Sequence, residues 1–287
     1  MKVLITGSKG QLGSEIRELA GEYPLCEFIF TDLEELDITN AGAVEDFMNL
    51  HQPQAIVNCA AYTAVDKAET EQETAFQVNS RAPANLAKAC NKFNAILLHI
   101  STDYVFDGKS WFPYSESSPT NPVSVYARSK WEGENQISSI ANRAVIIRTS
   151  WLYSAFGNNF VKTILRYGKE RGKLNVVYDQ AGTPTYARDL AKAILDILPR
   201  LDASTGVEVF NYSNEGVCSW YDFAVAIINN SGIDCKIHPI ETKDYPLPAV
   251  RPFYSVLSKD KIKNRFNLSI PYWHDSLKHC LSRMKSM

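Results

Sequence analysis

The segment YARSK contains a tyrosine and a lysine four residues apart, Tyr126 and Lys130. If the segment is helical, this spacing puts the two side chains on one face, one turn apart. A lysine ammonium there could lower the pKa of the phenol from its usual value of about 10, and the phenol could donate a proton to a carbonyl oxygen. The pair alone is a weak signal, because this spacing often arises by chance.

A second polar group follows the apolar run AILLHIS, where Thr102, Asp103 and Tyr104 come directly after Ser101. Ligands of open α/β sheets bind at the carboxyl ends of the strands. We therefore expect Thr102 to hydrogen-bond the same carbonyl oxygen as Tyr126, with its two successors beside the substrate.

A glycine-rich turn opens the chain, in KVLITGSKGQLGSEIREL, with Gly7, Gly10 and Gly13 between an apolar run and a helical pattern. Glycines let the backbone approach a pyrophosphate, and the helix N-terminus stabilises its charge. A strand before the turn and a helix after it are the context that a dinucleotide site requires. The alternative is a turn that serves only close helix packing.

The residues expected near the adenosine leave the choice of cofactor open. Asp32 follows the second apolar run, about 20 residues beyond the glycines, where a carboxylate can hydrogen-bond a ribose and favour NADH. Lys9 could instead meet the 2'-phosphate of NADPH. Asp37 and Ile38 lie where a loop could cover the adenine ring, or in an ordinary surface turn.

The elements that must position these residues alternate along the first half of the chain. Helical patterns separate runs that are apolar throughout, which is typical of parallel strands covered on both faces. The sequence therefore predicts a doubly wound Rossmann-type α/β fold. The predicted strands are 2–6, 27–31, 54–60, 95–101 and 144–150, and the predicted helices are 11–22, 41–51, 71–92 and 126–140.

The rhythm loosens after residue 150. We predict a dinucleotide-binding domain over 1–150 and a smaller α+β substrate-binding lobe over 151–287, some of whose segments return to the first sheet. The elements expected there are a helix near 158–172, a strand at 174–179, a helix at 187–198, an apolar run at 207–213 and a closing helix from about Trp273.

Composition excludes several classes of protein. With 45% hydrophobic and 22% charged residues, the 287-residue chain can bury a large core, and a net charge of -2 argues against nucleic acid as a partner. No apolar run is long enough to span a bilayer and the start does not resemble a signal peptide, so a cytoplasmic protein is expected. The six cysteines lack Cys-x-x-Cys spacing, which argues against disulfides and zinc.

With these residues in place, the chain resembles the extended short-chain dehydrogenase/reductase superfamily and, within it, the dTDP-4-dehydrorhamnose reductase family. The resemblance is carried by TGSKGQLGSE, VNCAAYTAVDKAE, HISTDYVFDG, SVYARSKWEGE, IIRTSWLY, DQAGTPTYARDLA and RPFYSVLSKDKI. It implies that Thr102, Tyr126 and Lys130 are catalytic. It also implies a cofactor site lined by Gly7, Gly10, Gln11, Leu12, Asp37, Ala60, Ala61, Tyr62 and Asn79. Tyr126 and Lys130 are expected to border the same site, where the Lys130 ammonium can hydrogen-bond the nicotinamide ribose.

The activity that this resemblance implies is reduction of the 4-keto group of dTDP-4-dehydro-L-rhamnose by NADPH or NADH. On the substrate side it suggests Trp151 at the sugar, with Gly182, Pro184 and Thr185 shaping the cleft. Arg251 could clamp the diphosphate, since a guanidinium matches phosphate oxygens bidentately. The alternatives are that Trp151 is a core residue and that Arg251 is solvated.

Some members of the family are described as homodimers bridged by magnesium through acidic side chains. Glu15 could supply one ligand, but Arg188 stands where another acidic residue would be sought, so no metal is predicted and a homodimer is left open. Similar dehydratases place an Asp-Glu pair after the threonine, whereas Tyr104 follows Asp103 here, which favours reduction. A reductase of another dTDP-4-keto-6-deoxysugar and a non-catalytic cofactor-binding regulatory subunit are the remaining alternatives.

Overall fold

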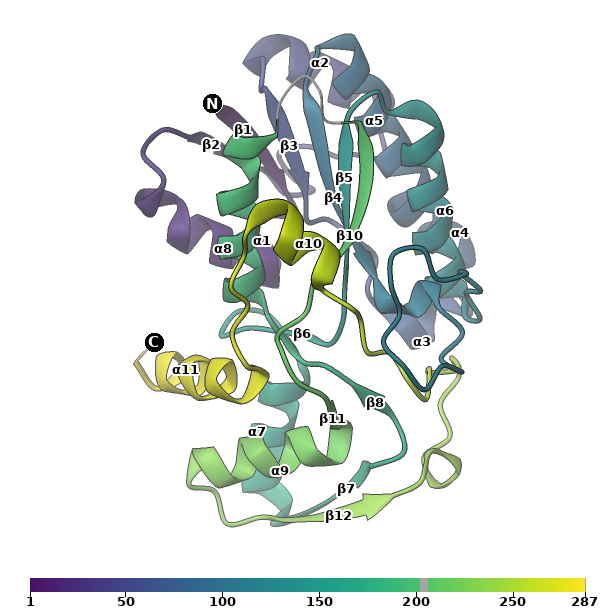
Figure 1. Cartoon of the computed structure of the whole chain (residues 1–287), viewed down its shortest axis with the longest axis vertical. Helices are drawn as coiled ribbons and strands as arrows, with labels where there is room; N and C mark the ends of the chain where they lie inside the picture. The colour runs from purple at the N-terminus through teal and green to yellow at the C-terminus, as the bar shows by residue number, and fades with distance from the viewer. Residues whose placement is uncertain (202–205, 287) are drawn as a thin grey trace.

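A parallel sheet of six strands forms the upper part of the molecule in Figure 1, which shows the computed structural model; the structure describes residues 1–201 and 206–286. The strand order is β10-β5-β4-β3-β1-β2, and every neighbouring pair is parallel. The predicted doubly wound class is confirmed. The strands are β1 (Lys2–Thr6), β2 (Glu27–Phe30), β3 (Ala55–Asn58), β4 (Ile96–Thr102), β5 (Ala144–Thr149) and β10 (Val207–Asn211).

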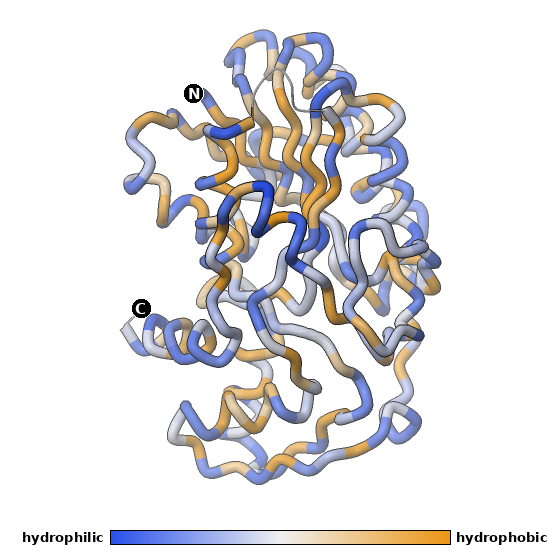
Figure 2. The backbone as a smooth tube through the Cα atoms, viewed as in Figure 1, coloured by the Kyte–Doolittle hydropathy of each residue, from blue (hydrophilic) through white to orange (hydrophobic). Residues whose placement is uncertain are grey.

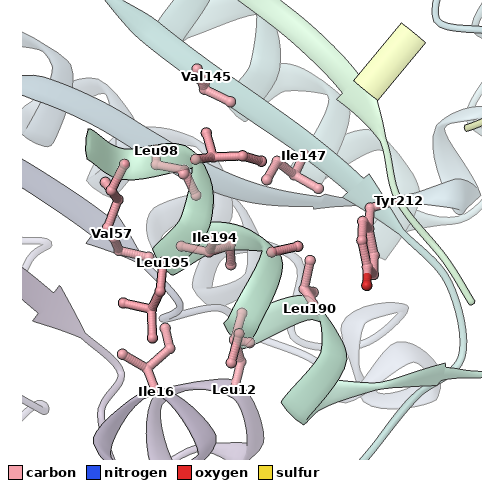
Figure 3. Packing of buried hydrophobic residues seen from close by; sticks show 14 of the residues in the cluster. Leu12, Ile16, Val57, Leu98, Val145, Ile147, Leu190, Ile194, Leu195 and Tyr212 are labelled. Carbon is pink, nitrogen blue, oxygen red and sulfur yellow. The ribbon is translucent and has the colours of Figure 1, made fainter. Parts of the chain in front are cut away.

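Helices cover both faces of this sheet because strand side chains alternate between the faces. On one face, α1 (Gln11–Leu19) and α8 (Ala187–Ile197) pack against the strands (Figure 3). On the other, α2 (Ala41–His51), α5 (Ala82–Lys92) and α6 (Val125–Ile140) bury a second cluster. Figure 2 shows the sheet as the most hydrophobic part of the chain in that view.

The order in which successive strands are added to the sheet reverses at β1. Strand β2 lies on one side of β1 and β3 on the other, so the carboxyl ends of β1 and β3 form the switch point where ligands of such folds bind. The glycine turn after β1 lies there, against the backbone of the segment after β3.

The helix predicted over 71–92 is wrong as a single α-helix. It consists of α4 (Gln72–Phe76), a π-helical segment η2 (Gln77–Arg81) and α5. Segments of π-helix are frequent at functional sites. The helix predicted over 11–22 also divides, into α1 and the 3-10 turn η1 (Ala20–Glu22). Short helical pieces follow β3 and β4, namely α3 (Val65–Ala68) and η3 (Asp103–Val105).

A second lobe fills the lower part of Figure 1. Its strands β7 (Lys173–Val177) and β12 (Lys236–Ile240) pair in parallel. A separate cluster that includes Tyr153, Phe223 and Trp273 forms its core. Its helices are α7 (Phe160–Arg171), α9 (Trp220–Ser231) and α11 (Trp273–Ser286), of which α9 was not predicted.

Several segments beyond residue 150 belong to the first sheet and its layers. Strand β10 is its edge, α8 covers one face, and α10 (Asp260–Phe266) buries Ile262 and Phe266 in the same cluster. Two short pairs complete the lower lobe: β6 (Leu152–Tyr153) with β9 (Thr185–Tyr186), and β8 (Ala181–Gly182) with β11 (Cys218–Ser219). The boundary at residue 150 stays a prediction.

The remaining short elements are the 3-10 turns η4 (Leu198–Arg200) and η5 (Thr242–Asp244). Over residues 1–201 and 206–286, no helix combines the length and the apolar character that crossing a membrane requires.

Candidate active site

The glycine turn has the shape of a phosphate site. Gly7 has a φ of +65°, and a Cβ there would lie 2.6 Å from the Ala60 nitrogen. A Cβ on Gly13 would lie 2.5 Å from the Gly7 carbonyl oxygen. Helix α1 begins after Gly10 with no side-chain cap, so its first N–H groups can receive an anion. The residues present therefore fit the pyrophosphate of a dinucleotide.

Two neighbours in this turn differ in what they offer. Gln11 is half-buried and its Oε1 accepts a hydrogen bond of 3.0 Å from Asn159, just before α7. Leu12 points into the core beneath the sheet, so only its backbone can face a cofactor.

Asp32 borders the turn from the end of β2. Its Oδ2 accepts a 2.9 Å hydrogen bond from the Lys9 N–H, and its Oδ1 accepts one from Leu33 N–H. The Lys9 ammonium, by contrast, pairs with Glu34 Oε2 at 2.5 Å. The lysine that could have favoured NADPH is therefore held by a carboxylate.

The two residues expected at the adenine, Asp37 and Ile38, make contacts within the protein. Asp37 Oδ1 accepts hydrogen bonds from the backbone N–H and the hydroxyl of Thr39. Ile38 is buried in the core on the α2 face.

Asn79, in the π-helical segment, holds the loop after β3 in place. Its Oδ1 accepts from Tyr62 N–H at 2.9 Å, and its Nδ2 donates to Tyr62 O at 3.0 Å and to Ser129 Oγ at 3.0 Å. Ala60 and Ala61 come just before this bridge and are half-buried. Asn79 thereby ties the loop expected to line the cofactor site to helix α6.

Helix α6 places the predicted catalytic pair at the carboxyl end of β4. Ser124 caps the helix, accepting from Ala127 N–H, so Tyr126 lies in its first turn. Lys130, one turn on, is only 2% exposed. Its Nζ donates to Ile100 O at 2.6 Å and lies 3.3 Å from His99 Nε2. Burial lowers the pKa of Lys130 to about 8.

The expected lowering of the Tyr126 pKa by Lys130 is wrong for this structure. Burial raises the pKa of Tyr126 to about 12, against a smaller opposing effect of the Thr102 hydroxyl. The lysine ammonium is occupied by the backbone of β4 instead of the phenol. The phenol is consequently protonated at neutral pH, which is the form a proton donor needs.

Asp103 and Tyr104 follow Thr102 at the end of β4. The Thr102 hydroxyl donates to Asp103 Oδ1 at 3.1 Å, and burial raises the pKa of Asp103 to about 7. The ring of Tyr104 meets that of Tyr126 edge-on, with 5.7 Å between centroids. Tyr104 also lines a cavity, so it joins the predicted catalytic pair to that space.

This cavity has a volume of about 820 Å³ and lies between α7, β7, β12 and the segment 242–253. Aromatic and basic side chains line it together with amide groups. Most of these residues were not predicted. The basic ones come at or just after the end of a helix, where charged side chains are typical of a solvated surface. The lining residues include Tyr167, Arg171, Lys173, Gln180, Trp220 and Tyr245.

The residues assigned to the sugar surround Trp151. This residue has a φ of +47°, rare for a bulky side chain, and its ring stacks on Trp220 with 3.6 Å between centroids. A Cβ on Gly182 would lie 2.7 Å from the Trp151 ring, so only glycine fits there. Pro184 and Thr185 are buried, and Thr185 accepts a hydrogen bond from Thr149. None of the four predicted residues, Trp151, Gly182, Pro184 and Thr185, lines the cavity itself; Trp220, on which Trp151 stacks, does.

Arg251 is neither solvated nor free. Its Nη1 and Nη2 each donate to one oxygen of Asp66 at 2.6 Å. It also lines the cavity. The guanidinium fork that was expected to hold a diphosphate is thus engaged by a carboxylate of the AYTAVDKAE motif.

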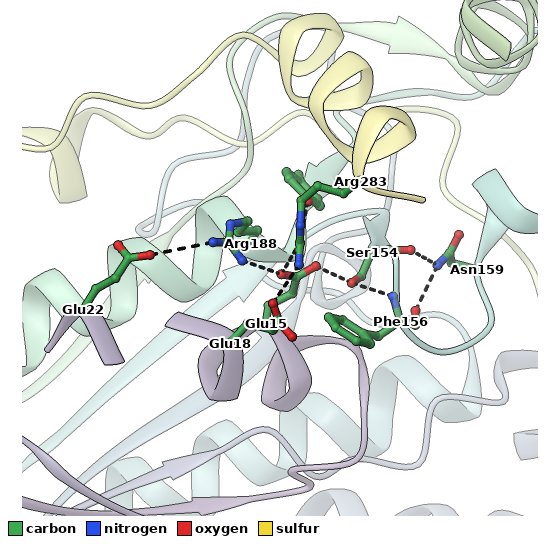
Figure 4. A network of polar contacts seen from close by, with 9 residues as sticks. Glu15, Glu18, Glu22, Ser154, Phe156, Asn159, Arg188 and Arg283 are labelled. Atoms are coloured by element: carbon green, nitrogen blue, oxygen red, sulfur yellow. Dashed lines mark hydrogen bonds and ion pairs between the residues drawn. The ribbon is translucent and has the colours of Figure 1, made fainter. Parts of the chain in front are cut away.

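Glu15, the acidic residue considered for magnesium, lies fully buried in the network of Figure 4. It accepts hydrogen bonds from Ser154 Oγ at 2.6 Å, Arg283 Nη1 at 2.8 Å and Arg188 Nη1 at 3.4 Å. Within the described part of the chain, no three His, Cys, Asp or Glu side chains gather in a way that could hold a metal.

A glycine turn at the switch point, a strand-end threonine and a Tyr-Lys pair on one helix face define a Rossmann-type reductase of the extended short-chain dehydrogenase class. Residues 1–286 match the family model described as RmlD substrate binding domain. The dTDP-4-dehydrorhamnose reductase of Aggregatibacter actinomycetemcomitans is 39% identical, over 97% of this chain and 97% of its own. The spore coat polysaccharide biosynthesis protein SpsK of Bacillus subtilis is 38% identical over 99% and 98%.

Solved structures agree with these sequences. A dTDP-4-dehydrorhamnose reductase from Clostridium acetobutylicum has a TM-score of 0.94 and 44% identity, over 99% of this chain and all of that chain. The enzyme of that name from Bacillus anthracis, solved in complex with NADP, has a TM-score of 0.92 and 37% identity over 98% and 99%. The chain belongs to the dTDP-4-dehydrorhamnose reductase family.

Proposed function

We propose that this protein reduces the 4-keto group of dTDP-4-dehydro-L-rhamnose to give dTDP-L-rhamnose, using NADH or NADPH. Full-length relatives at 36–39% identity carry the name of that reductase. The observation that carries the proposal is the position of Tyr126, whose ring meets Tyr104 on the wall of the cavity while its helix is tied through Asn79 to the loop after β3.

The protein's own groups supply the proton and the orientation. Bound NADH or NADPH supplies the hydride. Thr102 hydrogen-bonds the keto oxygen and Tyr126 donates its phenolic proton to that oxygen, which leaves a hydroxyl on carbon 4. Because the phenol is protonated at neutral pH, the donor is loaded before substrate binds. Lys130 stands one turn away and holds α6 against the backbone of β4.

The nucleotide part of the substrate fits the cavity beside Tyr104. Arg171 and Lys173 bring positive charge to its wall, which favours a diphosphate, and Tyr245 offers a face for stacking a base. The ring of Tyr167 already packs against the guanidinium groups of Arg166 and Arg171. The side-chain amide of Gln180 can read the polar edge of a pyrimidine. Trp151, locked by its stack on Trp220, is assigned to the sugar.

The experiment follows the absorbance of NADH and NADPH separately while dTDP-4-dehydro-L-rhamnose is generated in situ, and identifies the sugar formed. We expect oxidation of cofactor with formation of dTDP-L-rhamnose. A product with the opposite configuration at carbon 4 would assign another dTDP-4-keto-6-deoxysugar. Cofactor binding without any oxidation would overturn the proposal in favour of a regulatory subunit.

A further inference from the structure

A chain of buried polar groups crosses three neighbouring strands and ends at Lys130. It runs from Thr6 of β1 to Asn58 of β3, His99 of β4 and Lys130 of α6. All four residues are at most 2% exposed. Because these buried side chains bond to one another, the direction of each hydrogen bond constrains the next.

The direction is set at Asn58. Its Oδ1 accepts from the backbone N–H of Ala60 at 3.1 Å and from the Thr6 hydroxyl at 2.7 Å. A backbone N–H can only donate, so the atom that faces it must be the amide oxygen. The amide Nδ2 consequently points to His99 Nδ1, at 3.0 Å, and donates to it.

This bond decides the tautomer of His99. Because Nδ1 accepts, it carries no proton, and the proton of the neutral ring is on Nε2. Burial and the charge of Lys130 lower the pKa of His99 well below its ordinary value, so the ring is neutral at neutral pH. The Nε2–H then points at Lys130 Nζ, 3.3 Å away.

An ammonium and an Nε2–H that face each other are both donors, and neither can accept. A neutral amine has a lone pair and can accept the Nε2–H while it still donates to Ile100 O. We infer that Asn58 and His99 are positioning residues: they hold the Lys130 side chain, and the Nε2–H of His99 favours the neutral amine of Lys130 over the ammonium.

Other charged groups near Lys130 also affect which protonation state of its side chain is favoured. Glu134, one turn along α6, favours the ammonium, but it is itself held by Arg148 of β5 through bonds of 2.7 to 3.1 Å and by Ser101. At the end of β4, Asp103 acts on Tyr126. The polarity of the chain through His99 opposes Glu134, in the same direction as burial.

The inference rests on the proposed function, because a change in the charge of Lys130 affects the reaction only if that residue takes part in it. Its test therefore begins with a measurement that needs no turnover. In protein labelled with ¹⁵N-histidine, long-range proton–nitrogen spectra report which ring nitrogen carries the proton, and the signal of His99 is the one missing from His99→Gln. We expect the Nε2–H tautomer at pH 7. An Nδ1–H tautomer or an imidazolium would overturn the inference.

The decisive variant is Asn58→Asp, which keeps the shape but replaces the Nδ2 donor with an acceptor. We expect the tautomer to switch to Nδ1–H, because the carboxylate then accepts from His99 Nδ1. Nε2 becomes an acceptor for the ammonium, and the negative charge of the buried carboxylate acts in the same direction, so the titration of Lys130, followed by its ¹⁵Nζ shift, moves up by about one pH unit or more. Thr6→Val is the control, because Ala60 N–H still orients the amide and neither readout should change.

Turnover gives the last readout. The high-pH limb of kcat/KM for cofactor oxidation should move upward with the Lys130 titration in Asn58→Asp and stay in place in Thr6→Val. A tautomer switch that leaves the Lys130 titration unchanged would refute the inference. If no variant oxidises cofactor, the proposed function fails, while the two spectroscopic titrations still decide the inference.

Discussion

Asp66 and Arg251 form a two-point ion pair that joins α3 to the wall of the cavity, with both N–O distances at 2.6 Å. The same carboxylate accepts from Ala249 N–H at 3.2 Å, so it holds the segment 242–253 through backbone as well as side chain. Arg251→Lys keeps the charge and loses the fork. We expect KM for the nucleotide sugar to rise about tenfold, as for loss of about 1.4 kcal/mol, with the Kd of the cofactor unchanged.

Asp66→Asn distinguishes this role from direct binding of a diphosphate by Arg251. If the pair orders the cavity wall, the variant should raise KM as Arg251→Lys does; an unchanged or lower KM would show that Arg251 acts on the substrate alone.

The Arg251 guanidinium lowers the pKa of Asp66. The contribution of the pair to stability, about 1 kcal/mol at this half-exposed site, is present above the ordinary pKa and is lost as pH falls through the lowered one.

Tyr126→Phe should remove most turnover, because only the proton donor is lost. Proton transfer by a positioned group contributes about 10² to 10⁴ in rate, so kcat should fall by that order. Cofactor affinity, measured by quenching of protein fluorescence, should stay nearly unchanged. A rate close to that of the unmodified protein would remove Tyr126 from the mechanism.

Asp32→Ala should narrow any preference for NADH over NADPH, because a carboxylate beside the ribose repels a 2'-phosphate. The readout is the ratio of the two KM values. A second variant, Glu34→Gln, removes one of the two carboxylates that pair with the Lys9 ammonium and leaves Glu35 at 3.7 Å, so we expect a smaller fall in KM for NADPH and no change in KM for NADH. An unchanged ratio in Asp32→Ala would show that this residue reads no ribose.

Asp103→Asn should stabilise the protein above neutral pH. The pKa of this buried carboxyl is raised to about 7, so its protonated form is favoured by folding. The contribution of the protonated carboxyl to the free energy of unfolding is complete below the unfolded pKa of about 3.9. It is lost as pH rises toward 7, and the loss reaches at most about 4 kcal/mol. Urea unfolding of both proteins at pH 5 and pH 9 checks this. A gap between them that does not widen with pH would contradict it.

Glu15→Gln should destabilise the protein by about 1 to 3 kcal/mol, because it removes the charge that two arginines share. Glu18, which is half-exposed and pairs with Arg283 at 3.2 Å, offers the control Glu18→Gln, with an expected loss below about 1 kcal/mol. Urea unfolding measures both.

The network around Glu15 also predicts that activity, stability and oligomeric state do not depend on magnesium. Since Arg188 and Arg283 already neutralise Glu15, we expect EDTA or added Mg²⁺ to leave kcat, Tm and sedimentation unchanged. Loss of activity with EDTA that Mg²⁺ restores would refute this.

The amino-acid sequence by itself predicted the five strands of the first 150 residues and the helices α1, α2, α5 and α6, because apolar runs and helical periodicity are local patterns. It also indicated the glycine turn, the strand-end Thr102 and the Tyr126–Lys130 spacing. Helix α9 was within reach of the same reasoning, since the SWYD segment forms a capping box through Ser219 and Asp222. The π-helical segment was not, because a helical pattern does not reveal one extra residue in a turn.

Only the tertiary structure decided what each side chain meets. Arg251 is paired with a residue 185 positions away in the chain, and Lys130 turns to His99 and Ile100 instead of the phenol. The stack of Trp151 on Trp220 likewise joins distant segments. Pairings of this kind depend on packing between elements far apart in sequence. The pKa of Tyr126 follows from the same packing, because burial outweighs the effect expected from a charge one helical turn away.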